Sequence, residues 1–220
     1  MDLNKHIEFF DPEKDLDNHI HIIGCGAIGS TLAEMLTRMG VPELTIYDMD
    51  IVTPHNLTNQ EYLHRHIGKP KTESLQELLK EINPNIHITD KGEYTNQRLS
   101  GHIFLCVDNI DLRRNILKQN LQNQTIKTVF DFRMGLTDAQ QYAAEWTPDG
   151  QEIILSTMDF TSEEAKAANP INACGMDLNV KQTVTSVVSL GLANFINFLK
   201  GKPLKRMILI DSFNQMLDAF

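Results

Sequence analysis

One stretch decides the fold: residues 19–48 read HIHIIGCGAIGSTLAEMLTRMGVPELTIYD. Its first five residues form a short apolar run that is typical of a buried strand, and glycines follow at once. Apolar side chains then recur at helical spacing up to Met39, and Gly40 ends the helix. Residues 44–48 form a second β-rich run. The stretch therefore predicts a strand, a glycine turn, a helix that begins at Ala27, and a second strand.

The glycine turn indicates a nucleotide site. Gly24, Gly26 and Gly29 form G-x-G-x-x-G between a strand and a helix. In this motif the first glycine permits the turn, the second lets the backbone approach a phosphate, and the third lets the helix pack closely on the strand. The free N–H groups at the helix start, at Ala27, can bind an anion, and Asp48 ends the next strand, where it can accept from ribose hydroxyls. The motif alone does not separate NAD from ATP, and a tight turn without a ligand is the plain alternative.

Strands and helices continue to alternate beyond this unit. Further strands are expected at 86–89, 102–107, 126–132 and 207–211, and helices near 75–82, 110–121 and 178–200. The turn Pro148-Asp149-Gly150 between QYAAEWT and QEIILST predicts an antiparallel hairpin. We therefore predict an α/β fold: a Rossmann-like, mostly parallel sheet flanked by helices, with an antiparallel extension in the C-terminal half.

We expect a single domain over residues 1–220, in which 1–18 form an N-terminal extension and 156–173 a polar crossover loop. The net charge of −9 argues against a nucleic-acid partner, because phosphate contacts need clustered lysine and arginine. The N-terminus does not resemble a signal peptide, and no apolar run reaches the roughly 18 residues of a membrane span. We therefore expect a cytoplasmic protein without a membrane partner. The cysteines are widely spaced and form no C-x-x-C pair, so no zinc is expected.

The segment after Asp48 makes a family resemblance specific. Residues 48–75 read DMDIVTPHNLTNQEYLHRHIGKPKTESL, which resembles the D-x-D, N-L-x-R-Q and G-x-P-K-x-x-S segments of the ThiF/MoeB/HesA family, relatives of the ubiquitin-activating enzymes. CVDN at 106–109, with Arg113 or Arg114 after it, resembles the family's x-T-D-N-x-x-x-R segment. The match is dense from about His19 to Phe132.

The resemblance implies an adenylyltransferase that uses ATP and Mg²⁺ to activate a C-terminal carboxylate. The carboxylate would belong to a small ubiquitin-like or sulfur-carrier-like protein or to a peptide tail, and the family also implies a homodimer. Carried over by position, the resemblance gives the following roles: Asp48 binds ribose, Asp50 and Asn56 line the nucleotide pocket, Gln60 supports it, Lys71 meets the phosphates, and Asp108 lies near the magnesium-bound triphosphate. Cationic groups are needed there because the attacking carboxylate and the phosphates repel each other.

The chain also departs from the family pattern. Asn59 stands where N-L-x-R-Q has arginine, and no arginine precedes His19. Arg65, Lys69 and Arg113 are candidates to replace the lost charge. Two alternatives therefore remain: a catalytically degenerate nucleotide-binding partner or regulatory protein of the same fold and, less favoured, an NAD-dependent oxidoreductase.

Several site residues have a plain structural alternative. Lys71 could be a solvated lysine at a helix start, and Asp108 could cap the following helix. Cys174 follows the polar loop near a helix start, with Lys181 close in sequence, so it could attack the adenylate as a catalytic thiolate. A buried structural cysteine is the equal alternative. His64 and His66, at i and i+2 in a loop, are expected to be solvent-exposed rather than metal ligands.

Overall fold

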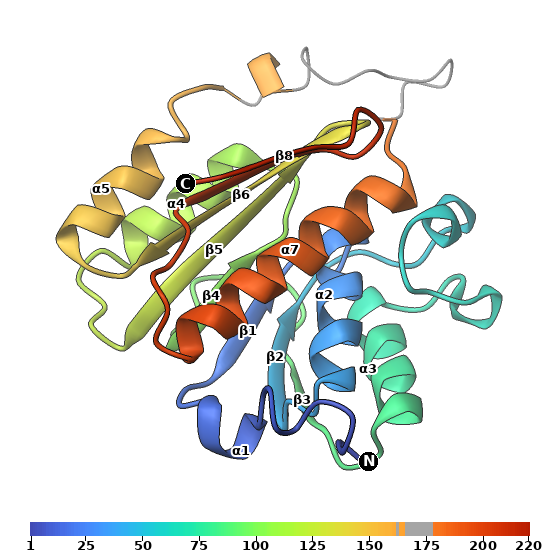
Figure 1. The fold of residues 1–220 in the computed structure, drawn as a ribbon. Coiled ribbons are helices and arrows are strands. Elements are labelled where there is room, and N and C mark those ends of the chain that lie inside the picture. The colour runs from blue at the N-terminus through green and yellow to red at the C-terminus, as the bar shows by residue number, and fades with distance from the viewer. Residues whose placement is uncertain (162, 166–177) are drawn as a thin grey trace.

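The computed structural model describes residues 1–161, 163–165 and 178–220. One eight-stranded sheet carries helices on both faces (Figure 1). The strand order is β3-β2-β1-β4-β5-β6-β7-β8. The strands are β1 (Ile20–Ile23), β2 (Glu43–Tyr47), β3 (His87–Asp90), β4 (Gly101–Leu105), β5 (Ile126–Met134), β6 (Asp138–Glu145), β7 (Met207–Asp211) and β8 (Met216–Ala219). The α-helices are α1 (Pro12–Asp15), α2 (Ala27–Arg38), α3 (Lys71–Ile82), α4 (Ile110–Gln119), α5 (Pro148–Ser156) and α7 (Lys181–Leu199).

The sheet changes character at β6. Strands β3, β2, β1, β4 and β5 are parallel, with Ile22 of β1 opposite Ile46 of β2 on one side and Phe104 of β4 on the other. Strands β6, β7 and β8 each pair antiparallel with their neighbour. The predicted fold class, a mostly parallel sheet with an antiparallel extension toward the C-terminus, is confirmed.

Each face of the sheet has its own hydrophobic core. Helices α2, α3 and α7 cover one face, where Leu32 and Phe195 pack with Phe104 (Figure 1). Helices α4 and α5 cover the other, where Ile103 and Trp146 are buried. Burial of each such side chain contributes about 1.5–3 kcal/mol, so both layers hold the strand ends in fixed relative positions.

Helix α7 is the one helix of the described chain that is long and apolar enough to cross a bilayer. Half of its most apolar stretch is buried inside the protein, and the side chains of Val184, Val188 and Phe195 have less than 1% exposure. It contacts α2 and strands β5, β6 and β7. Helix α7 is thus a core helix of this fold.

The predicted hairpin around Pro148-Asp149-Gly150 is wrong. The stretch after the proline is helix α5, and β6 pairs with β5 and β7 instead. The Thr147 side chain caps α5 by accepting from the Gly150 N–H at 3.2 Å, and Pro148 occupies the first turn. Proline after a threonine cap is as typical of a helix start as of a turn, and the helical spacing of Ile154 and Met158, both buried, decides between them. Half of the predicted crossover loop, 156–173, lies outside the described residues, namely 162 and 166–173.

Candidate nucleotide-binding site

The predicted site residues lie at the carboxyl edge of the parallel strands. The chain runs from β1 to β2 on one side and later returns to β4 on the other side of β1, which makes this edge a topological switch point. The glycine turn follows β1, Asp48 follows β2, and Asp108 follows β4. In open α/β sheets ligands bind at such a point, so the topology brings together segments that are far apart in the sequence.

The three glycines of the turn meet different surroundings. Gly24 has φ +98°, and a Cβ there would lie 2.7 Å from the Cys106 carbonyl carbon. A Cβ on Gly29 would lie 1.8 Å from the Gly24 oxygen, so this glycine is needed for the close approach of α2 to the turn. A Cβ on Gly26 would meet nothing within 4 Å. The space over Gly26 is therefore open to a ligand.

The N-terminus of α2 faces this open space without a cap. Gly26 is the N-cap residue, and no side chain bonds to the first turn. The Ser30 N–H donates to the Gly26 carbonyl at 3.0 Å, which leaves the N–H groups of Ala27, Ile28 and Gly29 without a partner inside the helix. Uncapped N–H groups and the positive end of the helix dipole together suit a phosphate.

Asp48 connects the glycine turn after β1 to the segment that follows β2. One carboxylate oxygen accepts from the Cys25 N–H at 2.7 Å and the other from the Asp50 N–H at 2.8 Å. The Tyr62 hydroxyl donates to the Cys25 carbonyl at 2.6 Å. The glycine turn is thus tied both to the end of β2 and to the segment that contains Tyr62.

Lys71 is not the solvated lysine of the plain alternative. It is buried at the start of α3, and its Nζ lies 2.8 Å from Oδ2 of Asp50. Its N–H also donates to the Asp50 carbonyl at 2.9 Å. Asp50 is 59% exposed on its side chain, so the structure places a buried cation behind an exposed carboxylate at the predicted pocket.

The side-chain amides of Asn56 and Gln60 differ in their hydrogen-bond partners. Asn56 is buried, and its Oδ1 accepts from the N–H and the hydroxyl of Thr53, both at 2.9 Å, which stabilises the 3-10 turn Pro54–Thr58. The Oε1 of Gln60 is buried and has no partner among the described residues. An unpaired buried acceptor costs about 1–3 kcal/mol, so Gln60 is the polar group of this segment that would gain most from a ligand.

Asp108 is exposed just beyond β4. It does not cap α4, because Asn109 does so by accepting from the Leu112 N–H at 3.0 Å. The capping alternative is therefore wrong. No described residue donates a hydrogen bond to the Asp108 carboxylate, which leaves both oxygens available to a ligand.

Arg113 cannot supply a cation to the nucleotide. It is buried, donates to the Asp131 carboxylate and the Val107 carbonyl, and lies 2.5 Å from the Phe132 carbonyl. These contacts hold the chain immediately before Asp108. Arg113 is thus a structural support of the site, which corrects the expectation that it could replace the missing arginine.

The other two candidate replacements are also paired with acids. Arg65 donates to Glu81, and Lys69 lies 2.8 Å from Glu77. Both acids belong to α3, so each of these cations is already engaged with a carboxylate of that helix.

Sequence reasoning missed the partners of Arg113. Asp131 on β5 has no exposed side-chain surface and also accepts from Arg133 at 2.7 Å. Arg133 in turn donates to the carbonyl and hydroxyl of Thr157 at 2.6 and 2.7 Å. A sequence signal was present, since Asp131 interrupts the apolar run TVFDF, but Arg113 comes from a different element, α4, and so could not be paired with Asp131 from the sequence.

Asn59, at the position of the family arginine, serves a different role here. It is buried, and its Nδ2 donates to Oδ1 of Asn179, just before α7. A position expected to contact phosphate instead anchors the start of the last long helix.

The sequence profile of the ThiF family matches residues 7–217. The chain belongs to the ThiF family. Among curated relatives, it is 31% identical over 133 residues to tRNA threonylcarbamoyladenosine dehydratase of Haemophilus influenzae, a match that covers 56% of this chain and 51% of that protein. It is 34% identical over 117 residues to molybdopterin-synthase adenylyltransferase of Escherichia coli, covering 49% and 47%. The chain thus spans about half the length of these ThiF-family relatives.

Among solved structures, E. coli MccB with ATP matches with a TM-score of 0.73 over 95% of this chain and 65% of that one, at 18% identity. At this identity the likeness shows the fold alone. It agrees with the ThiF-family architecture of one continuous sheet with its antiparallel strands at one side.

The described cysteines of this ThiF-family chain are not nucleophiles. Cys25 and Cys106 are buried, and burial raises the pKa of both thiols, that of Cys106 to about 12. Both are therefore protonated packing groups at neutral pH. Cys174, the predicted catalytic thiol, lies outside the described residues.

The expectation of a solvent-exposed His66 is wrong. The imidazole has no exposed surface, and its Nδ1 accepts from the Leu63 N–H at 3.1 Å. Burial lowers its pKa, so it is neutral at physiological pH. His66 shapes the loop before α3, while His64 is exposed as expected.

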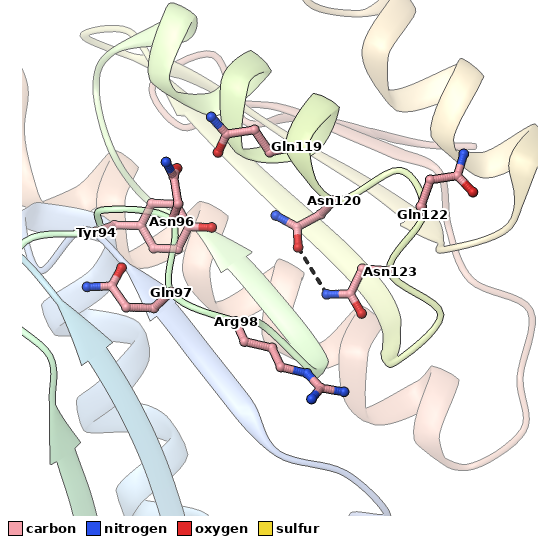
Figure 2. A pocket seen from close by; sticks show the side chains of 8 residues that line it. All are labelled: Tyr94, Asn96, Gln97, Arg98, Gln119, Asn120, Gln122 and Asn123. Atoms are coloured by element: carbon pink, nitrogen blue, oxygen red, sulfur yellow. Dashed lines mark hydrogen bonds between the residues drawn. The ribbon is translucent and has the colours of Figure 1, made fainter.

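A cavity of about 530 Å³ lies elsewhere, between the β3–β4 connection and the segment from the end of α4 to β5 (Figure 2). Amide side chains dominate its lining, and Asn123 donates to Asn120 at 3.0 Å within the segment that follows α4. The lining residues are Tyr94, Asn96, Gln97, Arg98, Gln119, Asn120, Gln122 and Asn123. None of the predicted nucleotide-binding residues lines this cavity, so it is separate from the site at the carboxyl edge.

Proposed function

We propose that the chain is an ATP-dependent adenylyltransferase that activates a carboxylate. The observation that carries the proposal is the convergence at one sheet edge of an open glycine turn, an uncapped helix N-terminus, buried Lys71 and exposed Asp108, which accepts no hydrogen bond from any residue that the structure describes. The first two suit phosphate, and the last suits a cation that accompanies phosphate. A dehydrogenase would need a group placed for hydride transfer, and this edge offers none among the described residues.

The residues fit magnesium bound together with a nucleotide. No cluster of three or more histidine, cysteine, aspartate or glutamate side chains in the described chain could hold a metal alone. Mg²⁺ usually binds through one or two carboxylates, substrate phosphates and water, and the exposed carboxylate of Asp108 fits that donor set. When bound, the ion would neutralise phosphate charge.

In the proposed reaction a carboxylate oxygen attacks the α-phosphorus of ATP, pyrophosphate leaves, and an acyl-adenylate forms. Lys71 and the N–H groups at Gly26 and Ala27 would hold the phosphates and offset the repulsion between the two anions. Asp48 keeps the glycine turn in place while this happens, because it bonds to the Cys25 N–H. In this step each of these groups acts by position and charge, and a later attack of Cys174 on the adenylate stays a prediction.

The chemical class of the substrate follows from the relatives. One is named for the adenylation of molybdopterin synthase, and MccB has been solved with the peptide MccA. We therefore propose a C-terminal carboxylate of a ubiquitin-like or sulfur-carrier-like protein, or of a peptide, acted on in the cytoplasm by a homodimer. The H. influenzae relative is named for a tRNA nucleoside, and the net charge of −9 disfavours tRNA for this chain.

Isotope exchange between pyrophosphate and ATP tests the proposal. With Mg²⁺ and a panel of carrier proteins and peptides, the wild type should show carboxylate-dependent exchange. Asp108→Asn and Lys71→Met should lower it at least a hundredfold, since single electrostatic contacts contribute roughly 10²–10³ in rate. The matched control Lys202→Met, an exposed lysine beyond α7, should keep the wild-type rate.

One observation favours the alternative function, a catalytically degenerate nucleotide-binding protein. Asn59 donates a hydrogen bond to Asn179, where the family residue would contact phosphate. It predicts that ATP raises the melting temperature while no carboxylate in the panel supports exchange. Absence of any ATP effect on a folded sample would refute both functions.

A further inference from the structure

The candidate site has few cations for a polyanionic ligand. Lys71 is the one lysine or arginine among its predicted residues, and it is already paired with Asp50. Arg113 is bound to Asp131 inside the fold. A triphosphate needs more positive charge than this, because each anionic oxygen that loses water must gain a donor or a cation.

A second lysine lies beside the glycine turn. Lys181 reaches back from α7, with its Nζ 2.8 Å from the hydroxyl of Thr31 on α2 and in an ion pair with Glu61. The Thr31 hydroxyl also bonds to the Ala27 carbonyl at 2.8 Å and to Glu61 at 3.0 Å. The ammonium is therefore only two hydrogen bonds from the first residue of α2.

Glu61 lies next to the glycine turn, in the segment that also contains Tyr62. Its N–H donates to the Ser30 hydroxyl at 3.2 Å, and the neighbouring Tyr62 bonds to the Cys25 carbonyl. The ion pair of Glu61 with Lys181 is thus attached to the glycine turn from two sides. It is not sealed in the core, because the side chains are 24% and 34% exposed.

The position of Lys181 is electrostatically unfavourable unless an anion is nearby. It is the first residue of α7, where the helix dipole repels a cation, and the first turn of α7 contains no acidic residue. The uncapped start of α2 adds a second positive helix end next to it. Glu61 supplies one negative charge to this lysine, so the contact with the acid and the two helix ends act on the same ammonium group.

The protein holds this arrangement in place. Asn59 donates to Asn179, two residues before Lys181, so the buried asparagine fixes the start of α7 against the site. The flexible four-carbon stem of Lys181 can then move its ammonium while the backbone stays fixed.

We propose that Lys181 exchanges Glu61 for a β- or γ-phosphate oxygen of bound ATP and is a phosphate-contacting cation of this site. The inference rests on the proposed ATP-dependent function. Glu61 holds the lysine in place and competes with the ligand, so it sets the affinity for ATP but not for AMP, which lacks the β- and γ-phosphates.

Titration calorimetry of the full chain with ATP and with AMP, both with Mg²⁺, tests this. Lys181→Met should weaken ATP binding roughly tenfold or more, the effect of one lost charged contact, and change AMP affinity less than about twofold. Lys181→Arg should retain most of the ATP affinity. Glu61→Gln should tighten ATP binding, because the lysine loses its internal competitor. Lys202→Met is the matched control and should bind ATP like the wild type.

The outcomes separate the two proposals. If the wild type binds ATP and Lys181→Met binds it equally well, the lysine role is refuted and the proposed function stands. An equal loss of ATP and AMP affinity in Lys181→Met, with a lowered melting temperature, would also refute the contact and indicate a structural role. Failure of the wild type to bind ATP would overturn both proposals.

Discussion

Replacing Asp131 with asparagine should destabilise the protein more than any other single carboxylate change near the site. The Asp131 side chain is fully buried between Arg113 and Arg133, and its two oxygens bond to different arginines. The substitution keeps the shape but removes the charge, so two largely buried guanidinium groups lose their counter-ion. Breaking a buried pair in this way costs about 3–5 kcal/mol. For a chain of this size each kcal/mol shifts the melting temperature by about 2–4 °C, which gives a fall of about 6–20 °C.

Urea unfolding followed by circular dichroism measures the difference directly. Asp111→Asn is the matched control, because Asp111 also pairs with an arginine, Arg114 at 2.7 Å, but is 54% exposed. An exposed pair contributes about 0–1 kcal/mol, so the control should unfold close to the wild type. A loss below about 1 kcal/mol in Asp131→Asn would refute the reasoning, since it would mean that the arginines do not depend on this carboxylate.

Three further outcomes follow from the site and its surroundings. Gly26→Ala should fold normally but bind ATP at least tenfold more weakly in calorimetry. Gly29→Ala should lower the melting temperature, because its Cβ would lie 1.8 Å from the Gly24 oxygen. Equal melting temperatures of the two variants would contradict this. Asn59→Arg restores the family residue, yet it should lower the melting temperature and not raise pyrophosphate exchange, because the side chain it replaces is buried. Burial lowers the pKa of His21 to about 4, below the unfolded value of about 6.5, so its contribution to stability is full above pH 6.5 and is lost as the pH falls toward 4. His21→Phe should flatten urea midpoints measured across that range, and an unchanged pH dependence would contradict the assignment.

The local parts of the fold and site could be predicted from the sequence. The glycine turn, α2 and Asp48 form one contiguous stretch. Its hydrophobic periodicity and glycine spacing indicate the strand, turn and helix without information from the rest of the chain. Lys71 begins α3 and Asp108 follows β4, so each lies beside an element that the sequence pattern indicated, and their roles toward a nucleotide stay predictions. Their environments were not predictable. Lys71 is buried with its ammonium paired to Asp50, and Asp108 stays exposed because Asn109 is the N-cap residue of α4.

The errors arise where a residue's partner is distant or where one signal serves two structures. Thr147 and Pro148 fit a turn as well as a helix start, and only packing on β6 and α4 selects the helix. Asn59 looked like a missing cation, because Asn179, which explains it, lies 120 residues later. No property of the sequence around Asn59 indicates that pairing.

The position of β1 between β2 and β4 has a consequence for how the protein folds. His21 pairs with Thr45 on one side and with Ile103 on the other, so the second pairing closes a far longer loop than the first. The β5–β6 hairpin, by contrast, needs only neighbouring residues. Local hairpins form early and long parallel closures late, because chain entropy opposes them. During synthesis the glycine turn therefore emerges before Asp108, and the two meet only after β4 has paired with β1.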